Sequence, residues 1–219
     1  MISMGTLTLY YEKERVRFAR LAAGAARKAG DYEHPVFGEG PLGAKLMFVG
    51  EAPGAEEASL GRPFIGRAGK QLDGLLREAG ITREDAFVTN AVKYRPVKDG
   101  RRGHCNRPPT GDEIKDGLAL LLLEISAAAP EIIATLGNTP LNALLALAGA
   151  PPLRRGEVRG KRMDVIINGD QYRLFPLYHP ASIIYNTSLK AVLERDLRAL
   201  NVELTGLTHQ EGETNEKLG

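Results

Sequence analysis

Residues 49–69 read VGEAPGAEEASLGRPFIGRAG and continue directly from the apolar run AKLMFVG at 44–50. The run predicts a buried strand, and the glycines after it would let backbone N–H groups approach a bound molecule closely. The stretch lacks both the Gly-Lys-Ser/Thr of a phosphate-binding loop and the dinucleotide pattern G-x-G-x-x-G. Because the carboxylate of Glu51 would repel a phosphate, this position favours a water, a cationic sugar or a base N–H, unless Glu51 is simply an exposed turn acid.

The rest of the sequence predicts a sheet built around this strand. Further strands are expected at 86–92, 131–137 and 172–179, and helices at 13–29 (ending at Gly30), 67–80, 114–129, 139–149 and 188–200. Strands that alternate with helices form a mostly parallel sheet covered on both faces. We therefore expect an α/β fold, a three-layer αβα sandwich with a short central sheet, as a single domain over residues 1–205. Residues 206–219 are polar without periodicity and predict a frayed C-terminal tail.

Short-range signals support three of these helices. Thr110 and Glu113 have the spacing of a capping box ahead of the helix at 114–129. Gly80 supplies a C-terminal stop for the helix at 67–80. Glu194 and Arg198 lie four residues apart on the last helix, where an ion pair is expected.

Chemically active side chains follow three of the four strands. Glu51, Asn90 and His179 each stand near the end of a strand, and the carboxyl ends of parallel strands form the edge where ligands bind. The amide of Asn90 offers one acceptor and two donors, so it can pair with the edge of a planar imide. Phe64 adds an aromatic ring in the glycine-rich loop. Each residue also has a plainer interpretation: Glu51 and Asn90 as turn residues, His179 as a structural histidine and Phe64 as a core ring. Because all four are expected at one edge of one sheet, we nevertheless predict a binding site there.

Composition limits the classes of protein to which this chain can belong. The 219 residues carry a formal net charge of +2, too small to identify a nucleic-acid binder, although KDGRRGHCNRP at 98–108 forms a local basic segment. No apolar stretch approaches the roughly 20 residues of a membrane span, and no signal peptide is recognised, so we expect a cytoplasmic protein. Cys105 is the single cysteine, which excludes an internal disulfide and an all-cysteine metal site.

Four segments together resemble the uracil-DNA glycosylase superfamily. They are the stretch at 49–69, FVTNAVKYRP at 87–96, NRPPTGDEI at 106–114 and HPASIIYN at 179–186. The branch that looks nearest is the bacterial and archaeal iron–sulfur group called family 4. The resemblance implies an enzyme that flips uracil out of DNA and hydrolyses the N-glycosidic bond, leaving an abasic site. We expect it to be monofunctional, because the matched positions contain no lysine that could act as an amine nucleophile. The resemblance also implies DNA with uracil or another deaminated base as partner, and we expect a monomer.

The resemblance assigns roles to particular residues. Glu51 matches the acid that positions water or stabilises positive charge on the sugar, and His179 matches the histidine that donates toward uracil O2. Phe64 matches the ring that stacks on the flipped base, and Asn90 the amide that reads its edge. The base-binding set is completed by Gly50 and Ala52. The segment expected to enter the minor groove consists of Pro180, Ala181, Ser182, Ile183, Ile184 and Tyr185.

The cluster cysteines of family 4 are missing from this chain. Two of these cysteines are expected before the first motif, but the segment there, FARLAAGAARKAGDYEHP at 18–35, contains no cysteine. Tyr94 stands at the third position, Gly117 is the equivalent of the fourth, and Cys105 matches none of them. One thiolate cannot hold a cluster that needs four, so we expect neither a cluster nor any other cofactor or metal.

The segment VKDGRRGHC at 97–105 is a further departure from the family pattern. We expect Arg101, Arg102 and His104 to contact DNA phosphate from a basic loop. A related class of uracil-recognising proteins carries Arg-Arg-x-His here and bonds covalently to the abasic sugar, so a covalent adduct through His104 is one alternative. An idle surface loop is another.

Two alternatives concern activity itself. A non-catalytic DNA-binding relative is disfavoured because the acid, the amide and the imidazole are all present. Lyase chemistry would need an amine nucleophile, for which Lys93, close to Asn90 in the sequence, is the one candidate.

Overall fold

The computed structural model describes residues 2–23, 30–31, 34–101 and 103–216. Its centre is a five-stranded sheet in the order β3-β2-β6-β8-β7. The strands are β2 (Leu46–Gly50), β3 (Ala86–Asn90), β6 (Ile132–Leu136), β7 (Met163–Ile167) and β8 (Asp170–Leu177). The first four in that order run parallel, and β7 pairs antiparallel with β8 at one edge. The four predicted strands are confirmed, and β7 is added to them.

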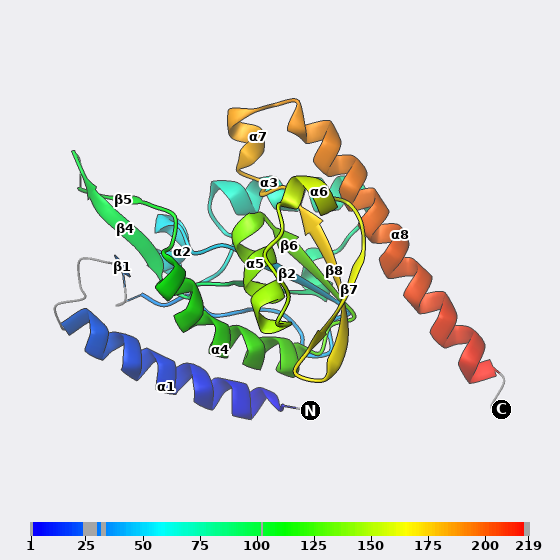
Figure 1. Cartoon of the computed structure of the whole chain (residues 1–219), viewed down its shortest axis with the longest axis horizontal. Helices are drawn as coiled ribbons and strands as arrows, with labels where there is room; N and C mark the ends of the chain where they lie inside the picture. Colours follow the sequence, from blue (N-terminus) through cyan, green and yellow to red (C-terminus); the bar gives the residue numbers. More distant parts are fainter. Residues whose placement is uncertain (1, 24–29, 32–33, 102, 217–219) are drawn as a thin grey trace.

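Helices cover both faces of the sheet and confirm the three-layer sandwich (Figure 1). One face carries α3 (Arg67–Ala79) and α8 (Leu189–Glu216), and the other carries α4 (Gly111–Ala128) and α5 (Asn138–Leu147), with α1 (Met4–Ala23) packed against α4. Shorter helices are α2 (Ala55–Leu60), α6 (Arg155–Val158) and α7 (Ser182–Tyr185), with a 3-10 turn at Arg83–Asp85.

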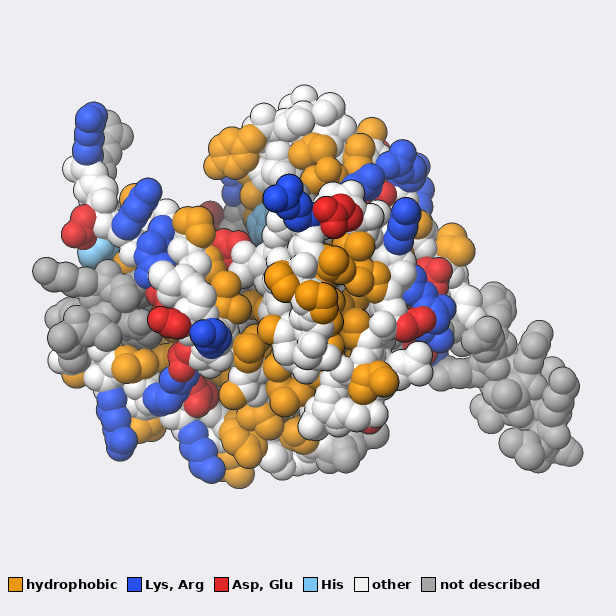
Figure 2. Space-filling view, viewed as in Figure 1, with side chains coloured by type: hydrophobic (Ala, Val, Ile, Leu, Met, Phe, Trp, Pro, Cys, Tyr) orange, Lys and Arg blue, Asp and Glu red, His pale blue; other side chains and the backbone are white. Residues whose placement is uncertain are grey.

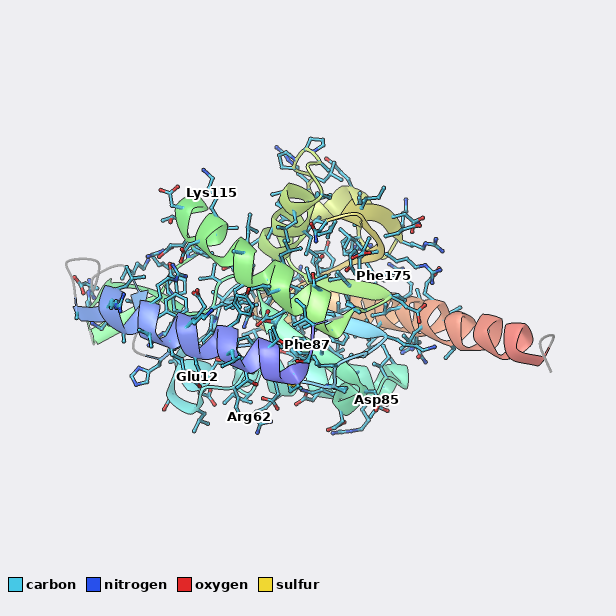
Figure 3. All side chains as sticks on the ribbon, turned by 90° about the horizontal axis from the view of Figure 1, so that it is seen from below. Glu12, Arg62, Asp85, Phe87, Lys115 and Phe175 are labelled. Atoms are coloured by element: carbon cyan, nitrogen blue, oxygen red, sulfur yellow. The ribbon has the colours of Figure 1, made fainter. Side chains whose placement is uncertain are left out.

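The two faces hold separate hydrophobic cores because successive strand side chains point in opposite directions. In β2, Leu46 and Phe48 pack under α3 and α8, whereas Met47 and Val49 pack under α4 and α5. Viewed from below, Phe87 lies in the interior while Glu12 and Arg62 lie at the periphery (Figure 3).

The short-range helix signals are confirmed. Gly80 ends α3 with φ +74°, the left-handed conformation that glycine adopts at little cost. Thr110 Oγ1 accepts from the backbone N–H of Glu113 at 3.3 Å, and Glu113 Oε2 accepts from that of Thr110 at 2.7 Å. The Arg198 guanidinium lies 3.7 Å from the Glu194 carboxylate.

The first and last helices differ from the prediction. Helix α1 begins at Met4 rather than at residue 13, the predicted end over 24–29 lies outside the described residues, and Gly30 belongs to β1 (Gly30–Asp31). Helix α8 extends to Glu216 and so includes residues 206–216, whereas the polar C-terminal tail stays a prediction. The single domain over 1–205 stays a prediction. None of the described helices combines the length and apolar character required to cross a membrane.

The basic segment is a β-hairpin rather than a loop. Strand β4 (Arg95–Gly100) pairs antiparallel with β5 (Gly103–Asn106), and β1 adds to the outer side of β4. Gly103 has φ +102° at the turn, a conformation that favours glycine. The hairpin projects from the body of the domain in Figure 1.

Candidate active site

The ends of β2 and β3 place Glu51 beside Asn90. In the parallel register Gly50 is opposite Asn90. Beyond the strands, the backbone N–H of Ala91 donates to Gly50 O at 2.8 Å, and that of Val92 donates to Glu51 O at 3.0 Å. The two turns that carry the acid and the amide are therefore tied to each other through the backbone.

A cavity of about 390 Å³ opens at this edge of the sheet. The side chains that line it include Glu51, Phe64, Asn90 and His179. The structure thus brings together the four residues that the sequence placed at strand ends and in the glycine-rich loop. Its remaining walls are formed by residues 52–57, by residues 66–68 at the start of α3, by Pro96, Asn106 and Arg107 at the base of the hairpin, and by Ala181 and Ile184 at the start of α7 and within it.

The carboxylate of Glu51 is held by a residue that the sequence analysis missed. Thr139 Oγ1 donates to Glu51 Oε2 at 2.5 Å. Thr139 stands in the first turn of α5, directly after β6, so the fourth parallel strand also ends at the site. The signal was the sequence GNTP at 137–140, whose threonine looks like an ordinary helix-start residue.

Gly50 is required by the close approach of Phe64 and Asn90. A Cβ atom at Gly50 would overlap both the Phe64 ring and Asn90 Oδ1. Asn90 is only 3% exposed. Its amide is therefore buried in the wall of the cavity, where an unmade hydrogen bond with a ligand would be costly.

The Phe64 backbone is strained and is held from both sides. Its φ is +54°, which costs an ordinary residue roughly 1–3 kcal/mol. Arg83 Nη2 donates to Pro63 O at 3.0 Å before the ring, and Glu57 Oε1 accepts from the N–H of Gly66 at 2.9 Å after it. Glu57 Oε2 also accepts from the N–H of Gly54 at 3.1 Å. One carboxylate thus joins the two ends of the glycine-rich stretch, a role the sequence analysis missed.

The ring of His179 is oriented by its own turn. The backbone N–H of Ala181 donates to His179 Nδ1 at 3.1 Å, and Ser182 Oγ donates to His179 O at 2.6 Å. Because Nδ1 accepts, the proton of a neutral imidazole resides on Nε2. The His179 and Phe64 rings lie 6.2 Å apart, tilted by 32°.

Lys93 belongs to a buried network behind Asn90. Its amine donates to Thr89 Oγ1 at 2.7 Å, to Asn90 O at 2.5 Å and to Glu124 Oε2 at 2.5 Å. The side chains of Lys93 and Glu124 are 1% and 0% exposed. Burial lowers the pKa of Lys93, while Glu124 opposes that shift. Lys93 is not among the described residues that line the cavity.

The same network reaches α1 through Tyr11. Its hydroxyl donates to Glu124 Oε1 at 3.0 Å, and the N–H of Gly38 donates to the same oxygen at 2.9 Å. Burial and the neighbouring Glu124 charge raise the pKa of the Tyr11 phenol far above its ordinary value. Tyr11 therefore acts as a permanent donor to that carboxylate.

The segment after His179 divides between buried and exposed side chains. Pro180 is buried, and Ile183 is 5% exposed in the core beneath α3 and α8, so these two side chains are not placed for the DNA contact expected of them. Ile184 lines the cavity, and Tyr185 is 89% exposed beside it. A contact with DNA by this segment stays a prediction.

The tip of the hairpin lies away from the cavity. Arg101 is exposed, and His104 Nδ1 lies 3.4 Å from Asp99 Oδ1 across the two strands, whereas Arg102 lies outside the described residues. Neither Arg101 nor His104 lines the cavity. Figure 2 shows a cationic side chain at this projecting tip, with acidic and histidine side chains below it.

The base of the hairpin, in contrast, forms part of the cavity wall. Arg107 binds both Glu113 oxygens, at 2.6 and 2.7 Å, and also donates to Val97 O at 3.0 Å. Arg95 Nε donates to Asn106 Oδ1 at 2.6 Å. These contacts fix the hairpin to the start of α4.

Two of the positions that match the family 4 cluster, Tyr94 and Gly117, lie among the described residues. Tyr94 is 2% exposed and contacts the Phe18 ring edge-on, with centroids 5.6 Å apart. A Cβ at Gly117 would overlap Ala91 O. Cys105 lies on β5, where its thiol donates to Lys98 O at 3.6 Å. Within the described part of the chain, no three His, Cys, Asp or Glu side chains are grouped so as to hold a metal ion.

Comparison with known proteins adds independent information. The model of the uracil DNA glycosylase superfamily matches residues 37–201. The type-4 uracil-DNA glycosylase of Saccharolobus solfataricus is 40% identical over 174 residues, which cover 79% of this chain and 77% of that protein. Those of Pyrobaculum aerophilum and Thermotoga maritima are each 38% identical, covering 75% and 74% of this chain and 81% and 79% of their own lengths.

Proposed function

This chain belongs to the uracil-DNA glycosylase superfamily, and we propose that it hydrolyses the N-glycosidic bond of uracil in DNA and leaves an abasic site. One observation carries the proposal: an acid, an amide, an imidazole and an aromatic ring line a single cavity. A base must leave the helix to enter it, which costs a few kcal/mol that recognition in the cavity has to offset.

Recognition of the base falls to Phe64 and Asn90. The ring of Phe64 offers a flat apolar surface for stacking, and the buried Asn90 amide offers an acceptor and donors in one plane. Uracil presents N3–H and O4 side by side and satisfies that amide. Cytosine presents an acceptor and a donor in the reverse order, and leaves the buried amide unpaired.

Departure of the base is assisted by His179. As the C1′–N1 bond breaks, its electron pair leaves with uracil, and negative charge gathers on O2. The N–H at His179 Nε2, fixed because Nδ1 accepts from Ala181, stabilises that charge by a hydrogen bond. One preoriented donor of this kind contributes about 3 kcal/mol to transition-state stabilisation.

Glu51 acts on the sugar. Loss of the base leaves a cation-like C1′, whose positive charge the carboxylate stabilises. The same carboxylate orients the water whose oxygen bonds to C1′, and accepts one water proton that passes to the departing base or to solvent. Since no lysine is among the described residues of the cavity wall, the reaction ends at the abasic site.

Contact with DNA is proposed for the two projections beside the cavity, the hairpin and α7. Arg101 on the hairpin carries a charge and donors suited to phosphate, and His104 adds a ring N–H. Ile184 and Tyr185 offer apolar surface to the gap left by the flipped base. A covalent adduct would require His104 to reach C1′, whereas His104 does not line the cavity. An SDS-resistant DNA adduct abolished by His104→Ala would support that alternative.

We also infer that the protein works without an iron–sulfur cluster. The sequence has one cysteine where a cluster needs four, and aromatic rings occupy the region of Tyr94. We expect the purified protein to be colourless and free of iron. Stoichiometric iron with visible absorbance would contradict this inference. The cytoplasmic location and the monomeric state stay predictions.

The activity is tested with oligonucleotides that each carry one uracil, hypoxanthine, xanthine, thymine or oxidised pyrimidine, followed by alkaline cleavage. We expect product from uracil with the wild type and with Glu12→Gln, a substitution of an exposed acid on α1. Glu51→Gln and His179→Ala should lose at least about a hundredfold in rate. Absence of product from uracil, or unchanged activity in both site variants, would overturn the proposal.

A further inference from the structure

Thr139 is the one side chain seen to hydrogen-bond to the Glu51 carboxylate within the described residues. The side chain donates to Glu51 Oε2 at 2.5 Å, within the short range typical of an O–H group bound to a charged oxygen. We propose that Thr139 is a positioning residue for Glu51, fixing one carboxylate oxygen so that the other faces the reacting sugar and water.

The placement of Thr139 is rigid. The N–H of Gly137 donates to Leu177 O at 3.1 Å, which ties the turn before α5 to the end of β8. Gly137 has φ +113°, so this turn needs glycine, and a Cβ there would come within 3.8 Å of His179 Cβ. Leu141 and Leu144, further along α5, are fully buried in the core. The hydroxyl is therefore delivered from a helix that is fixed at its start and along its length.

The position of this turn explains why a hydroxyl matters. The β6–α5 turn lies between Glu51 and His179, so it meets the acid that acts on the sugar and the imidazole that acts on the base. A glutamate side chain has three rotatable bonds, and without an anchor it would sample several rotamers within a cavity of about 390 Å³. Holding it in one rotamer before the substrate arrives lowers the cost of reaching the transition state.

The inference rests on the proposed glycosylase activity and predicts a particular kinetic signature. Thr139→Val keeps the shape and removes the hydroxyl. We expect kcat for uracil release to fall at least about tenfold, while KM stays within about twofold, because the hydrogen bond acts through Glu51 and not on the bound base. Thr139→Ser restores the hydroxyl and should recover most of the rate.

A double-mutant cycle separates positioning from a general structural effect. In a Glu51→Gln background, Thr139→Val should change the residual rate by less than about twofold, because the carboxylate that it positions is gone. Thr8→Val is the matched control, since Thr8 makes a comparable hydroxyl contact, to Met4 O on α1, away from the cavity. It should leave kcat unchanged. If Thr139→Val fails to fold, Thr139→Ala replaces it in the cycle.

The outcomes are distinguishable. If the wild type releases no uracil, the proposed function fails. If the wild type is active but Thr139→Val retains its kcat, raises KM alone, or loses as much rate in the Glu51→Gln background, the positioning role is wrong. A serine variant as slow as the valine variant would also overturn it.

Discussion

Replacement of Lys93 by methionine tests the buried network behind the active site. The substitution keeps the length of the side chain and removes its charge, leaving the Glu124 carboxylate at 0% exposure without its cation. Breaking a buried pair in this way typically costs 3–5 kcal/mol. Because Tyr11, Gly38 and Thr89 still donate to Glu124, we expect the lower end of that range, about 3 kcal/mol. That is a large part of the roughly 5–15 kcal/mol that stabilises a typical domain.

The measurement is urea unfolding followed by circular dichroism at neutral pH. Lys93→Met and Glu124→Gln should each lower the free energy of unfolding, and the double variant should lose less than the sum of the two, because neither charge is then left alone. Lys45→Met is the matched control, since its partner Glu131 lies 3.6 Å away with both side chains about a third exposed. It should cost less than about 1 kcal/mol. A Lys93→Met loss as small as that of the control, or strict additivity in the double variant, would refute the reasoning.

Three further predictions concern the site and its supports. Asn90→Asp should lower uracil excision at least about tenfold and raise cytosine excision, because a carboxylate accepts where the amide donated; unchanged discrimination in the oligonucleotide assay would contradict the role. Although burial favours its neutral form, Glu113 has a pKa below the ordinary value of 4.5 because Arg107 and the start of α4 bind the carboxylate. The Glu113 carboxylate therefore contributes fully to stability above pH 4.5, and this contribution is lost as the pH falls through its lower folded-state pKa. The unfolding free energies of the wild type and Glu113→Gln, measured against pH, should converge in acid. A constant difference between them would refute this. Gly50→Ala should abolish excision and destabilise the protein by about 1–3 kcal/mol, whereas Gly74→Ala, with open space around it in α3, should be neutral or stabilising; similar unfolding curves for both would refute the packing argument.

The central sheet and the site edge were predictable because their signals are local. Each parallel strand contains an apolar run, such as residues 46–49 in β2, because the sheet is covered on both faces. Glu51, Asn90 and His179 could be found because each stands at the end of such a strand or within two residues of it. Helical periodicity and caps identified α3 and α4 for the same reason, as with Gly80.

The parts that escaped depend on tertiary contacts. Helix α1 buries Leu7 and Phe18 but exposes Leu9 and Val16, so its apolar residues form no regular stripe. The hairpin carries charged residues in place of alternating apolar ones and is held by pairing between β4 and β5. Thr139 has no signal of its own, because its importance comes from meeting an acid 88 positions earlier in the chain.

The hydroxyl of Tyr11 contacts Glu124 from outside the stretch that the family model matches, which begins at residue 37. A shortened protein starting at residue 37 would retain every residue assigned to chemistry. It would, however, expose the surface of Tyr94 that Phe18 now covers. It would also remove the Tyr11 hydroxyl that donates to Glu124, whose carboxylate is linked to Asn90 through Lys93. The segment before residue 37 thus contributes packing and a hydrogen bond to the buried network behind Asn90, although the family match does not include it.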